Sequence, residues 1–197
     1  MTKIKNAVKI YVLLQDPRPT DEKVALLAER YCGAPGDYTV SRTNEGKPYF
    51  ANVKDVFFSV SHSKEYFACA LGSFEIGLDV QMQTIKKHES IEAAAEHYKR
   101  LAKRFFHPDE VKYVENGNVN SFFDVWCAKE SYSKYTGQGM DRYFGKYSVI
   151  PADPADIMHG KWQAMGKYFV RALLDDRYTL CVCTGVEAEI DIEYVNI

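Results

Sequence analysis

Residues 126–137 read WCAKESYSKYTG, and this stretch decides how the second half of the chain folds. Trp126, Glu130 and Lys134 recur every four residues, which places them on one face of a helix. Gly137 is typical of the position just after a helix, where glycine readily adopts a left-handed conformation. Asn120 is a suitable N-terminal cap. The sequence therefore predicts a helix that follows Asn120 and stops at Gly137.

Two interpretations of this helix face remain open at the level of residue spacing. A surface Glu–Lys pair beside a core tryptophan explains the pattern and is the common case. Alternatively, Glu130 supplies a metal ligand or a general base, and Lys129 and Lys134 bind phosphate as point charges.

The rest of the chain alternates between strand and helix patterns. Apolar residues at every second position predict a strand over residues 8–14. Thr20 is a possible cap for a helix that ends near Cys32. Other strands are predicted in 39–50, 55–63, 66–72 and 74–81, helices over 91–105 after Ser90 and from Pro108, and final strands in 162–174, 177–185 and 189–195.

This order of elements is that of an α+β fold. The chain can be divided near residue 74 into two pseudo-symmetric halves, 1–74 and 75–197. Each half contains a small antiparallel sheet packed on a helix, and an active site is expected at their interface. This plan favours a monomer with an internal pseudo-twofold axis, although the two halves show no convincing sequence repeat.

Composition excludes several classes of protein. The formal charge of −2 over 197 residues gives no global attraction to nucleic acid or to a membrane. No apolar run approaches the roughly 18 residues of a membrane span, and the N-terminus does not resemble a signal peptide. Five cysteines without a C-x-x-C pair argue against a disulfide framework or a zinc ribbon. Reduced thiols and a cytoplasmic location are expected.

Three other short stretches carry polar groups that could take part in chemistry. In GLDVQ, Asp79 and Gln81 point to the same face of a strand and could share a hard cation such as Mg²⁺. In SVSHS, Ser61 and His62 could hold an anion, and in EGKPYF, Lys47 could meet a phosphate. Each has a simpler alternative: a solvated strand end, a polar turn and a surface lysine.

Taken in order, GKPYF, FSVSHS, IGLDVQ and WCAKESYSK resemble the motifs of the 4′-phosphopantetheinyl transferases. The similarity is to the larger, pseudo-dimeric, surfactin-synthetase-activating type, whose members carry G-[RK]-P, S-H-S, G-[IV]-D-[IVL]-E and W-x-x-K-E-[SA]-x-x-K. It spans roughly residues 42–139. One position departs, because Gln81 stands where the family usually has glutamate.

The resemblance implies a reaction and a role for each matching residue. The family transfers the 4′-phosphopantetheine group of coenzyme A to a serine of an acyl or peptidyl carrier protein and releases adenosine 3′,5′-bisphosphate. Mg²⁺, with Mn²⁺ as a possible substitute, would be held by Asp79, Gln81 and Glu130. Glu130 would also be the base, and Lys134 would stabilise the leaving phosphate. The residues expected to contact coenzyme A are Lys47, Pro48, Ser61, His62, Trp126, Lys129 and Lys134.

The expected partner is an acidic carrier protein. Residues 86–104 contain six Lys or Arg against three Glu, a local excess that could guide such a carrier. Two alternatives remain. Gln81 could mark a catalytically weakened module that only binds coenzyme A or a carrier, or Asp79 and Glu130 could serve a metal-dependent phosphohydrolase.

Overall fold

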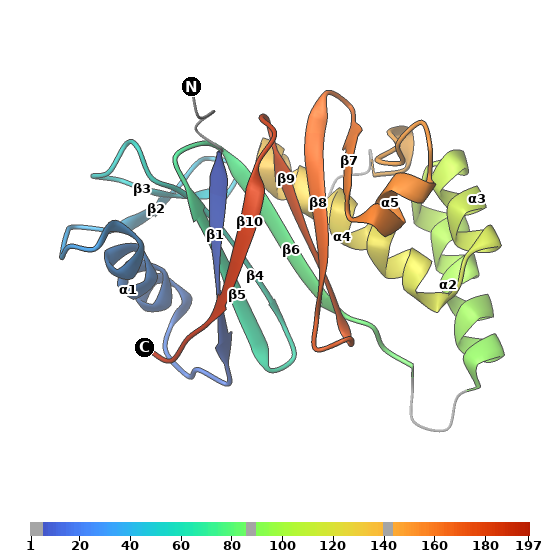
Figure 1. The fold of residues 1–197 in the computed structure, drawn as a ribbon, viewed down its shortest axis with the longest axis horizontal. Coiled ribbons are helices and arrows are strands. Elements are labelled where there is room, and N and C mark those ends of the chain that lie inside the picture. The colour runs from blue at the N-terminus through green and yellow to red at the C-terminus, as the bar shows by residue number, and fades with distance from the viewer. Residues whose placement is uncertain (1–5, 86–89, 140–143) are drawn as a thin grey trace.

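The computed structural model describes residues 6–85, 90–139 and 144–197. Within these ranges the chain forms two four-stranded sheets that lie side by side, with helices at both ends (Figure 1). The first sheet has the order β10-β1-β5-β4, the second has the order β6-β9-β8-β7, and β2 pairs with β3 in a small third sheet.

The strands are β1 Ala7–Leu14, β2 Val40–Arg42, β3 Pro48–Phe50, β4 Phe57–Ser63, β5 Tyr66–Gly72, β6 Ile76–Met82, β7 Lys161–Ala164, β8 Lys167–Leu174, β9 Tyr178–Thr184 and β10 Glu189–Tyr194. The helices are α1 Thr20–Cys32, α2 Ile91–Phe105, α3 Pro108–Asn116, α4 Val119–Thr136 and α5 Ala155–His159, with a 3-10 turn at Phe144–Lys146.

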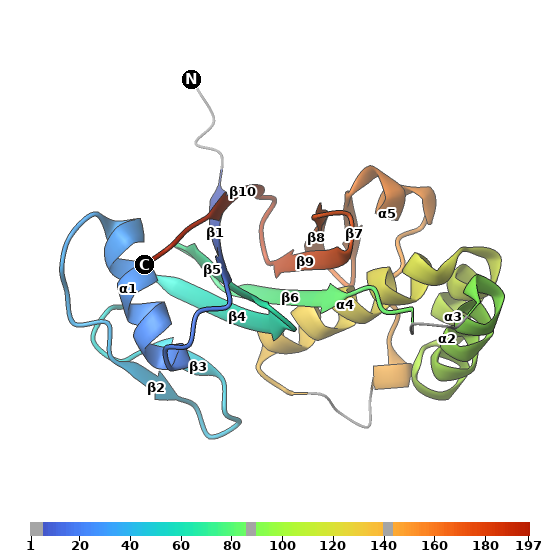
Figure 2. The same cartoon turned by 90° about the horizontal axis from the view of Figure 1, so that it is seen from below.

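The two halves repeat one topology, which confirms the predicted α+β class with related halves. In each half a first strand leads to a helix and then to a hairpin. The first strand then pairs antiparallel with the second strand of that hairpin, as β1 does with β5 and β6 does with β9. Helix α1 packs on the first sheet and α4 on the second, where it runs beneath β6 and β9 (Figure 2).

The last strand departs from the expected division of the chain. β10 pairs with β1, and the pairing is parallel, so the first sheet is mixed rather than purely antiparallel. Residues 189–194 therefore extend the sheet of the N-terminal half, although they follow residue 75. The boundary between residues 74 and 75 itself stays a prediction.

Local signals place most helix ends. Ser90 caps α2, with its hydroxyl accepting a hydrogen bond from the backbone N–H of Ala93 at 3.1 Å, as predicted. The cap of α4 is Asn118 rather than Asn120, and Pro19 precedes α1 without any side-chain cap from Thr20. In the described part of the chain, no helix combines the length and apolar character that a membrane crossing requires.

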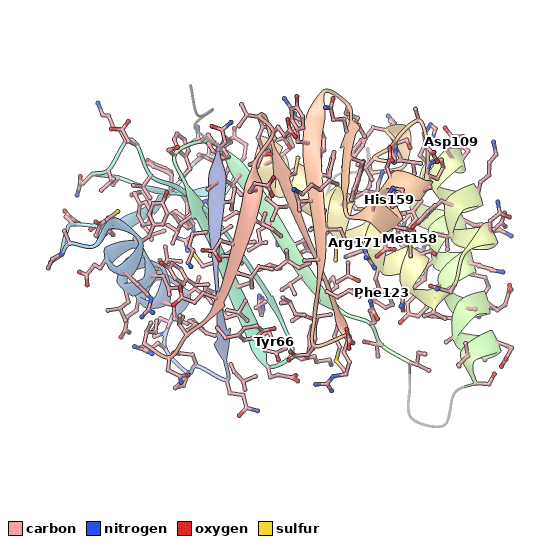
Figure 3. All side chains as sticks on the ribbon, in the orientation of Figure 1. Tyr66, Asp109, Phe123, Met158, His159 and Arg171 are labelled. Carbon is pink, nitrogen blue, oxygen red and sulfur yellow. The ribbon has the colours of Figure 1, made fainter. Side chains whose placement is uncertain are left out.

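The two sheets share a hydrophobic core. One core cluster takes Val8, Ile10 and Val12 from the first sheet and Leu78, Val80 and Val182 from the second. On the other side of the second sheet, the buried pair of Arg171 and Asp124 ties β8 to α4, with 2.5 Å between Nε and Oδ1. Arg171 extends from β8 toward this helix (Figure 3).

Gly77 lets β6 approach α4 closely. A Cβ atom at this position would lie 1.8 Å from the carbonyl oxygen of Ser131 and 2.5 Å from the backbone nitrogen of Tyr135. Only a residue without a side chain fits there, so the sequence GLD in β6 sets the distance between this strand and the helix.

Replacing Gly77 with alanine is expected to destabilise the protein by about 1–3 kcal/mol, because backbone atoms of α4 must move to admit the methyl group. Urea unfolding of the variant should show this loss. The matched control is Gly166→Ala: a Cβ there meets no atom within 4 Å, and only its backbone conformation opposes the change. A Gly77→Ala protein as stable as the wild type would show that β6 and α4 are not in close contact.

Candidate active site

Asp79 on β6 is held by side chains from three elements. Its Oδ1 atom accepts hydrogen bonds from Nζ of Lys134 and from the hydroxyl of Ser61, each at 2.8 Å. Its Oδ2 atom accepts from the amide nitrogen of Gln81 at 3.3 Å. The carboxylate is only 2% exposed. As predicted, β6 and α4 therefore bring their functional side chains together, and Lys134 is the cation beside Asp79.

Glu130 is the second carboxylate at this point, and one of its oxygens has no partner. Oε1 is buried and makes no hydrogen bond. Burial, and then the charge of Asp79, raise the pKa of Glu130 to about 7, while the charge of Lys134 acts in the opposite direction. A buried acceptor without a donor beside another carboxylate is the environment that a cation relieves.

These groups fit a hard divalent cation. Mg²⁺ prefers oxygen ligands and needs only one or two carboxylates when substrate phosphates and water complete its shell. Among the described residues, no group of three or more His, Cys, Asp or Glu side chains could hold a metal ion. Asp79 and Glu130 therefore form a two-carboxylate set. The amide nitrogen of Gln81 donates to Asp79. Only its amide oxygen could therefore serve as the predicted third metal ligand.

A cavity of about 280 Å³ opens beside Glu130, where the halves of the chain meet. Its walls come from the loop before β3, from β4 and from the C-terminal half of α4. They include Lys47, Pro48, Glu130 and Lys134 among the predicted residues. Segments nearly 90 residues apart thus share one cavity, and the predicted position of the site between the halves agrees with it.

Lys47 is fixed at the edge of this cavity. Its Nζ donates to the carbonyl oxygen of Tyr135 at 2.6 Å and pairs with the carboxylate of Glu75 at 2.6 Å. Neither Tyr135 nor Glu75 was predicted, because only the meeting of α4 with the loop before β6 brings them to this lysine.

Ser61 and His62 lie on different faces of β4, which argues against the expectation that both hold one phosphate. Side chains alternate along a strand. Ser61 is buried against β6 and bonded to Asp79, whereas His62 is exposed. His62 instead continues the row of Phe58 and Val60, which line the cavity. It remains available to a ligand, and Ser61 does not.

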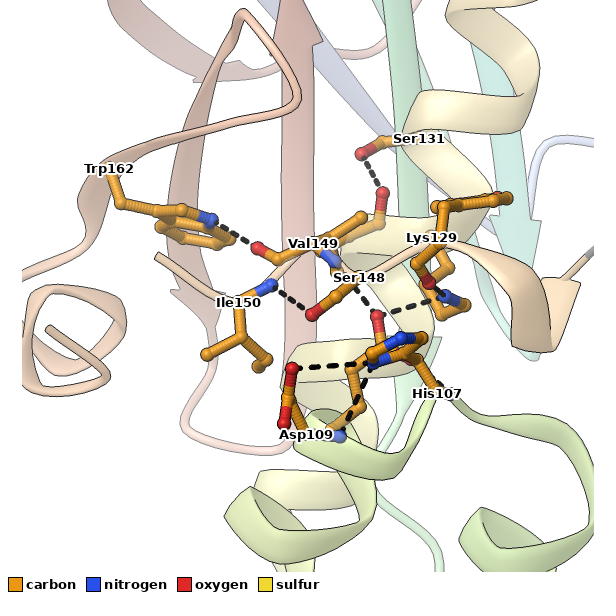
Figure 4. A network of polar contacts seen from close by, with 11 residues as sticks. His107, Asp109, Lys129, Ser131, Ser148, Val149, Ile150 and Trp162 are labelled. Carbon is orange, nitrogen blue, oxygen red and sulfur yellow. Dashed lines mark hydrogen bonds and ion pairs between the residues drawn. The ribbon is translucent and has the colours of Figure 1, made fainter. Parts of the chain in front are cut away.

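Lys129 does not line the cavity at Lys47, which argues against its predicted contact with coenzyme A. The side chain is fully buried and donates to Oε1 of Glu110 at 2.8 Å and to the carbonyl oxygen of Tyr147 at 2.7 Å. Glu110 also accepts from the backbone N–H groups of His107 and Val149 (Figure 4). Burial lowers the pKa of Lys129 and raises that of Glu110. This pair joins α3, α4 and the segment before α5.

Trp126 is also displaced from the expected coenzyme site. Its ring packs on Phe122, with 5.7 Å between ring centroids, and on Phe106 and Phe144. It lines a separate cavity of about 310 Å³ that also has Gln81 in its wall. This apolar hollow lies one helical turn before Glu130 and is distinct from the cavity at Lys47.

The chain belongs to the 4′-phosphopantetheinyl transferase superfamily, whose family model matches residues 75–183, more than half of its length. Similar proteins carry the same activity in their names. A 4′-phosphopantetheinyl transferase of Bacillus subtilis is 29% identical over 145 residues, which cover 71% of this chain and 60% of that protein. The 4′-phosphopantetheinyl transferase gsp of Aneurinibacillus migulanus is 35% identical over 111 residues, covering 54% of this chain and 41% of that protein.

The 4′-phosphopantetheinyl transferase Sfp of Bacillus subtilis strain 168 is 28% identical over 166 residues, covering 82% of this chain and 69% of that protein. The resemblance inferred from four short motifs is thus confirmed at the level of the family. The chain spans about 60% and 41% of the first two relatives it matches.

Proposed function

We propose that this protein transfers the 4′-phosphopantetheine group of coenzyme A to a serine hydroxyl of a carrier protein and releases adenosine 3′,5′-bisphosphate. The observation that supports it best is the partnerless Oε1 of Glu130 beside Asp79, at the end of a cavity that contains Lys47 and Lys134. Phosphoryl transfer needs such a place, where diphosphate charge is offset and a base is at hand.

Asp79 and Glu130 would hold Mg²⁺ or Mn²⁺, with Gln81 in the third position, and the ion would neutralise charge on the diphosphate of coenzyme A. Because glutamine brings no charge, the ion is expected to bind less tightly than at a site with three carboxylates. Glu130 would accept the proton of the attacking serine, directly or through a water molecule. The serine oxygen bonds to the β-phosphorus, and the bond from that phosphorus to the bridging oxygen breaks.

Lys134 would stabilise the leaving phosphate as it takes the electron pair. Its Nζ lies 2.8 Å from Asp79, so it neutralises this carboxylate before a ligand arrives. With a divalent cation bound, Asp79 would not need this ammonium group, and Lys134 would be free to contact the α-phosphate. Lys47, Pro48 and His62 would bind the adenosine 3′-phosphate end in and beside the cavity.

An acidic carrier protein is the proposed partner, and the protein is proposed to act as a monomer. Helix α2 presents Lys99, Arg100, Lys103 and Arg104, while Lys86 and Lys87 lie outside the described residues. Two of these cations have acidic neighbours: Arg100 is 3.9 Å from Glu96, and Lys103 is 2.8 Å from Glu115.

Mass spectrometry of a carrier protein tests the proposal. An apo-carrier with acidic residues beside its serine, incubated with this protein, coenzyme A and Mg²⁺, should gain the mass of one phosphopantetheine group. A module that only binds would bind coenzyme A and leave the mass of the carrier unchanged. A phosphohydrolase would release phosphate from small esters without any carrier, and either result would refute the transferase assignment.

Replacing Lys47 with methionine is expected to raise the Kd for coenzyme A about tenfold, a loss of about 1.4 kcal/mol, because a cation beside the phosphate groups is removed. Isothermal titration with coenzyme A measures the change. Lys112→Met is the control, since this exposed lysine on α3 pairs with Asp109 and lies outside the cavity. Equal affinities for the Lys47→Met protein and the control would place the coenzyme elsewhere.

A further inference from the structure

We propose that Ser61 is a positioning residue for the metal-binding carboxylate of Asp79, and that it acts from a row of three serines that joins the two halves of the protein. The serine row consists of Ser59, Ser61 and Ser63 on β4. The inference rests on the proposed function in one respect only, namely that Asp79 binds a divalent cation.

The serine row connects two strands that are each the edge of their own sheet. β4 is the last strand of the first sheet and β6 the first strand of the second. Alternate backbone N–H groups of β6 donate to alternate hydroxyls of β4: Leu78 to Ser59 at 2.9 Å, Val80 to Ser61 at 3.2 Å and Met82 to Ser63 at 3.0 Å.

This arrangement follows from the period of a strand. In an antiparallel pair, alternate residues direct their N–H groups toward the partner strand and the others away from it. The outward N–H groups of β6 point away from β9 and would be unpaired at a buried edge, since Leu78 and Val80 are fully buried. The serine hydroxyls supply the missing acceptors, and the repeat of two residues on both strands sets the register between the halves.

Ser61 differs from the other two serines because it also contacts Asp79. A serine hydroxyl has one proton to donate and two lone pairs to accept. Ser61 accepts from Val80 and donates its proton to Oδ1 of Asp79 at 2.8 Å. The neighbouring row members have no carboxylate within hydrogen-bonding distance in the described structure.

The bond from Ser61 gives the carboxylate a fixed orientation that does not depend on the substrate. Oδ1 of Asp79 is shared with Lys134, which the reaction requires at the leaving phosphate. When Lys134 turns to a phosphate, the donors that remain on Asp79 are Ser61 and the more distant amide of Gln81. Hydrogen bonds to metal ligands hold the ligand in place, and their loss typically lowers metal affinity 10–100-fold.

This assignment gives Ser61 a different role from the one its sequence motif suggests. Ser61 is 6% exposed and donates its single hydroxyl proton to Asp79, so it has no proton left for a phosphate. We therefore expect Ser61 to affect the binding of the cation and not the binding of coenzyme A in the absence of a cation.

The test compares Ser61→Ala with Ser63→Ala, which removes one row contact without touching Asp79. Binding of Mn²⁺ alone is followed by electron paramagnetic resonance, and thermal unfolding is measured in parallel. Both variants should unfold at a similar, slightly lower temperature. Only Ser61→Ala should lose Mn²⁺ affinity, by about 10–100-fold. Ser61→Thr, which keeps the hydroxyl, should recover most of that affinity.

Several outcomes would overturn the inference. They are wild-type Mn²⁺ affinity in Ser61→Ala, an equal loss in Ser63→Ala, no recovery in a folded Ser61→Thr protein, or no Mn²⁺ binding by the wild type. The inference would also be overturned if, without any metal, the Kd for coenzyme A rose in Ser61→Ala as much as in Lys47→Met. Because Mn²⁺ binding is measured without a carrier, failure of transfer in the mass spectrometry assay would refute the proposed function separately.

Discussion

Replacing Glu130 with glutamine is expected to lower the rate of phosphopantetheine transfer at least about 100-fold. The change keeps the shape of the side chain and removes the charge that we propose binds the cation and the basic oxygen that we propose accepts the serine proton. Single-turnover transfer to an apo-carrier, followed by mass spectrometry, measures the rate. Glu193→Gln is the control, because this residue on β10 pairs with Lys9 and Arg30, away from the site and from α2.

The same substitution should make the cation-free protein more stable at neutral and alkaline pH. Burial and Asp79 raise the pKa of Glu130 to about 7. Between its ordinary pKa of 4.5 and pH 7 the folded state therefore binds more protons than the unfolded state, and stability falls as the pH rises. Removing the ionisable group should raise the unfolding temperature by roughly 2–4 °C above pH 7, for a gain of about 1 kcal/mol, and leave it unchanged near pH 4.

Nearly normal transfer by Glu130→Gln, at a rate within a few-fold of the Glu193→Gln control, would remove Glu130 from the roles of base and ligand. A lower unfolding temperature at pH 8 in the absence of cations would contradict the view that the charge of Glu130 is only partly compensated in the folded protein.

Replacing Lys129 with methionine is expected to destabilise the protein by about 3–5 kcal/mol, because it leaves the carboxylate of Glu110 buried without a counter-charge. Both side chains are fully buried, and the ammonium group is the only cation that contacts Glu110 in the described structure. Chemical unfolding of the variant measures the loss. At a temperature where the variant is folded, its Kd for coenzyme A should equal that of the wild type.

A second change separates this charge effect from a loss of packing. The double variant Lys129→Met, Glu110→Gln removes the orphaned charge but keeps an amide oxygen for the backbone N–H of Val149, which Glu110 binds at 2.9 Å. It should regain at least half of the lost stability. A Lys129→Met protein with wild-type stability and weakened coenzyme binding would restore the role that the motif suggests.

The sequence alone predicts those parts of the site that depend on short-range periodicity. A spacing of four on a helix and of two on a strand places Glu130, Lys134 and Asp79 on faces that can meet, and in the structure they do. Gly77 and Lys47 lie in the motifs that carried the resemblance. The strands of the hairpins were also predictable, because each is a short stretch rich in apolar residues between turn signals.

Other parts depend on partners that are distant in sequence. Lys129 is next to Glu130 in the motif, but adjacent helical residues lie about 100° apart around the axis, so the two cannot share a face. Its partner Glu110 lies 19 residues away on another helix. The alternation of serines at 59, 61 and 63 was visible, but nothing local shows that a second strand edge lies opposite. The place of β10 beside β1 could not be predicted without knowing how the strands are ordered in both sheets.

The neighbouring positions of β1 and β10 have a consequence for biosynthesis. The ribosome makes Ala7–Leu14 well before residues 189–194, which form the strand that covers the outer edge of β1. Throughout elongation the nascent N-terminal region therefore exposes a hydrogen-bonding edge to other chains. β10 can pair with β1 only late in synthesis. Because the two strands are far apart in the sequence, this pairing is expected to be slow.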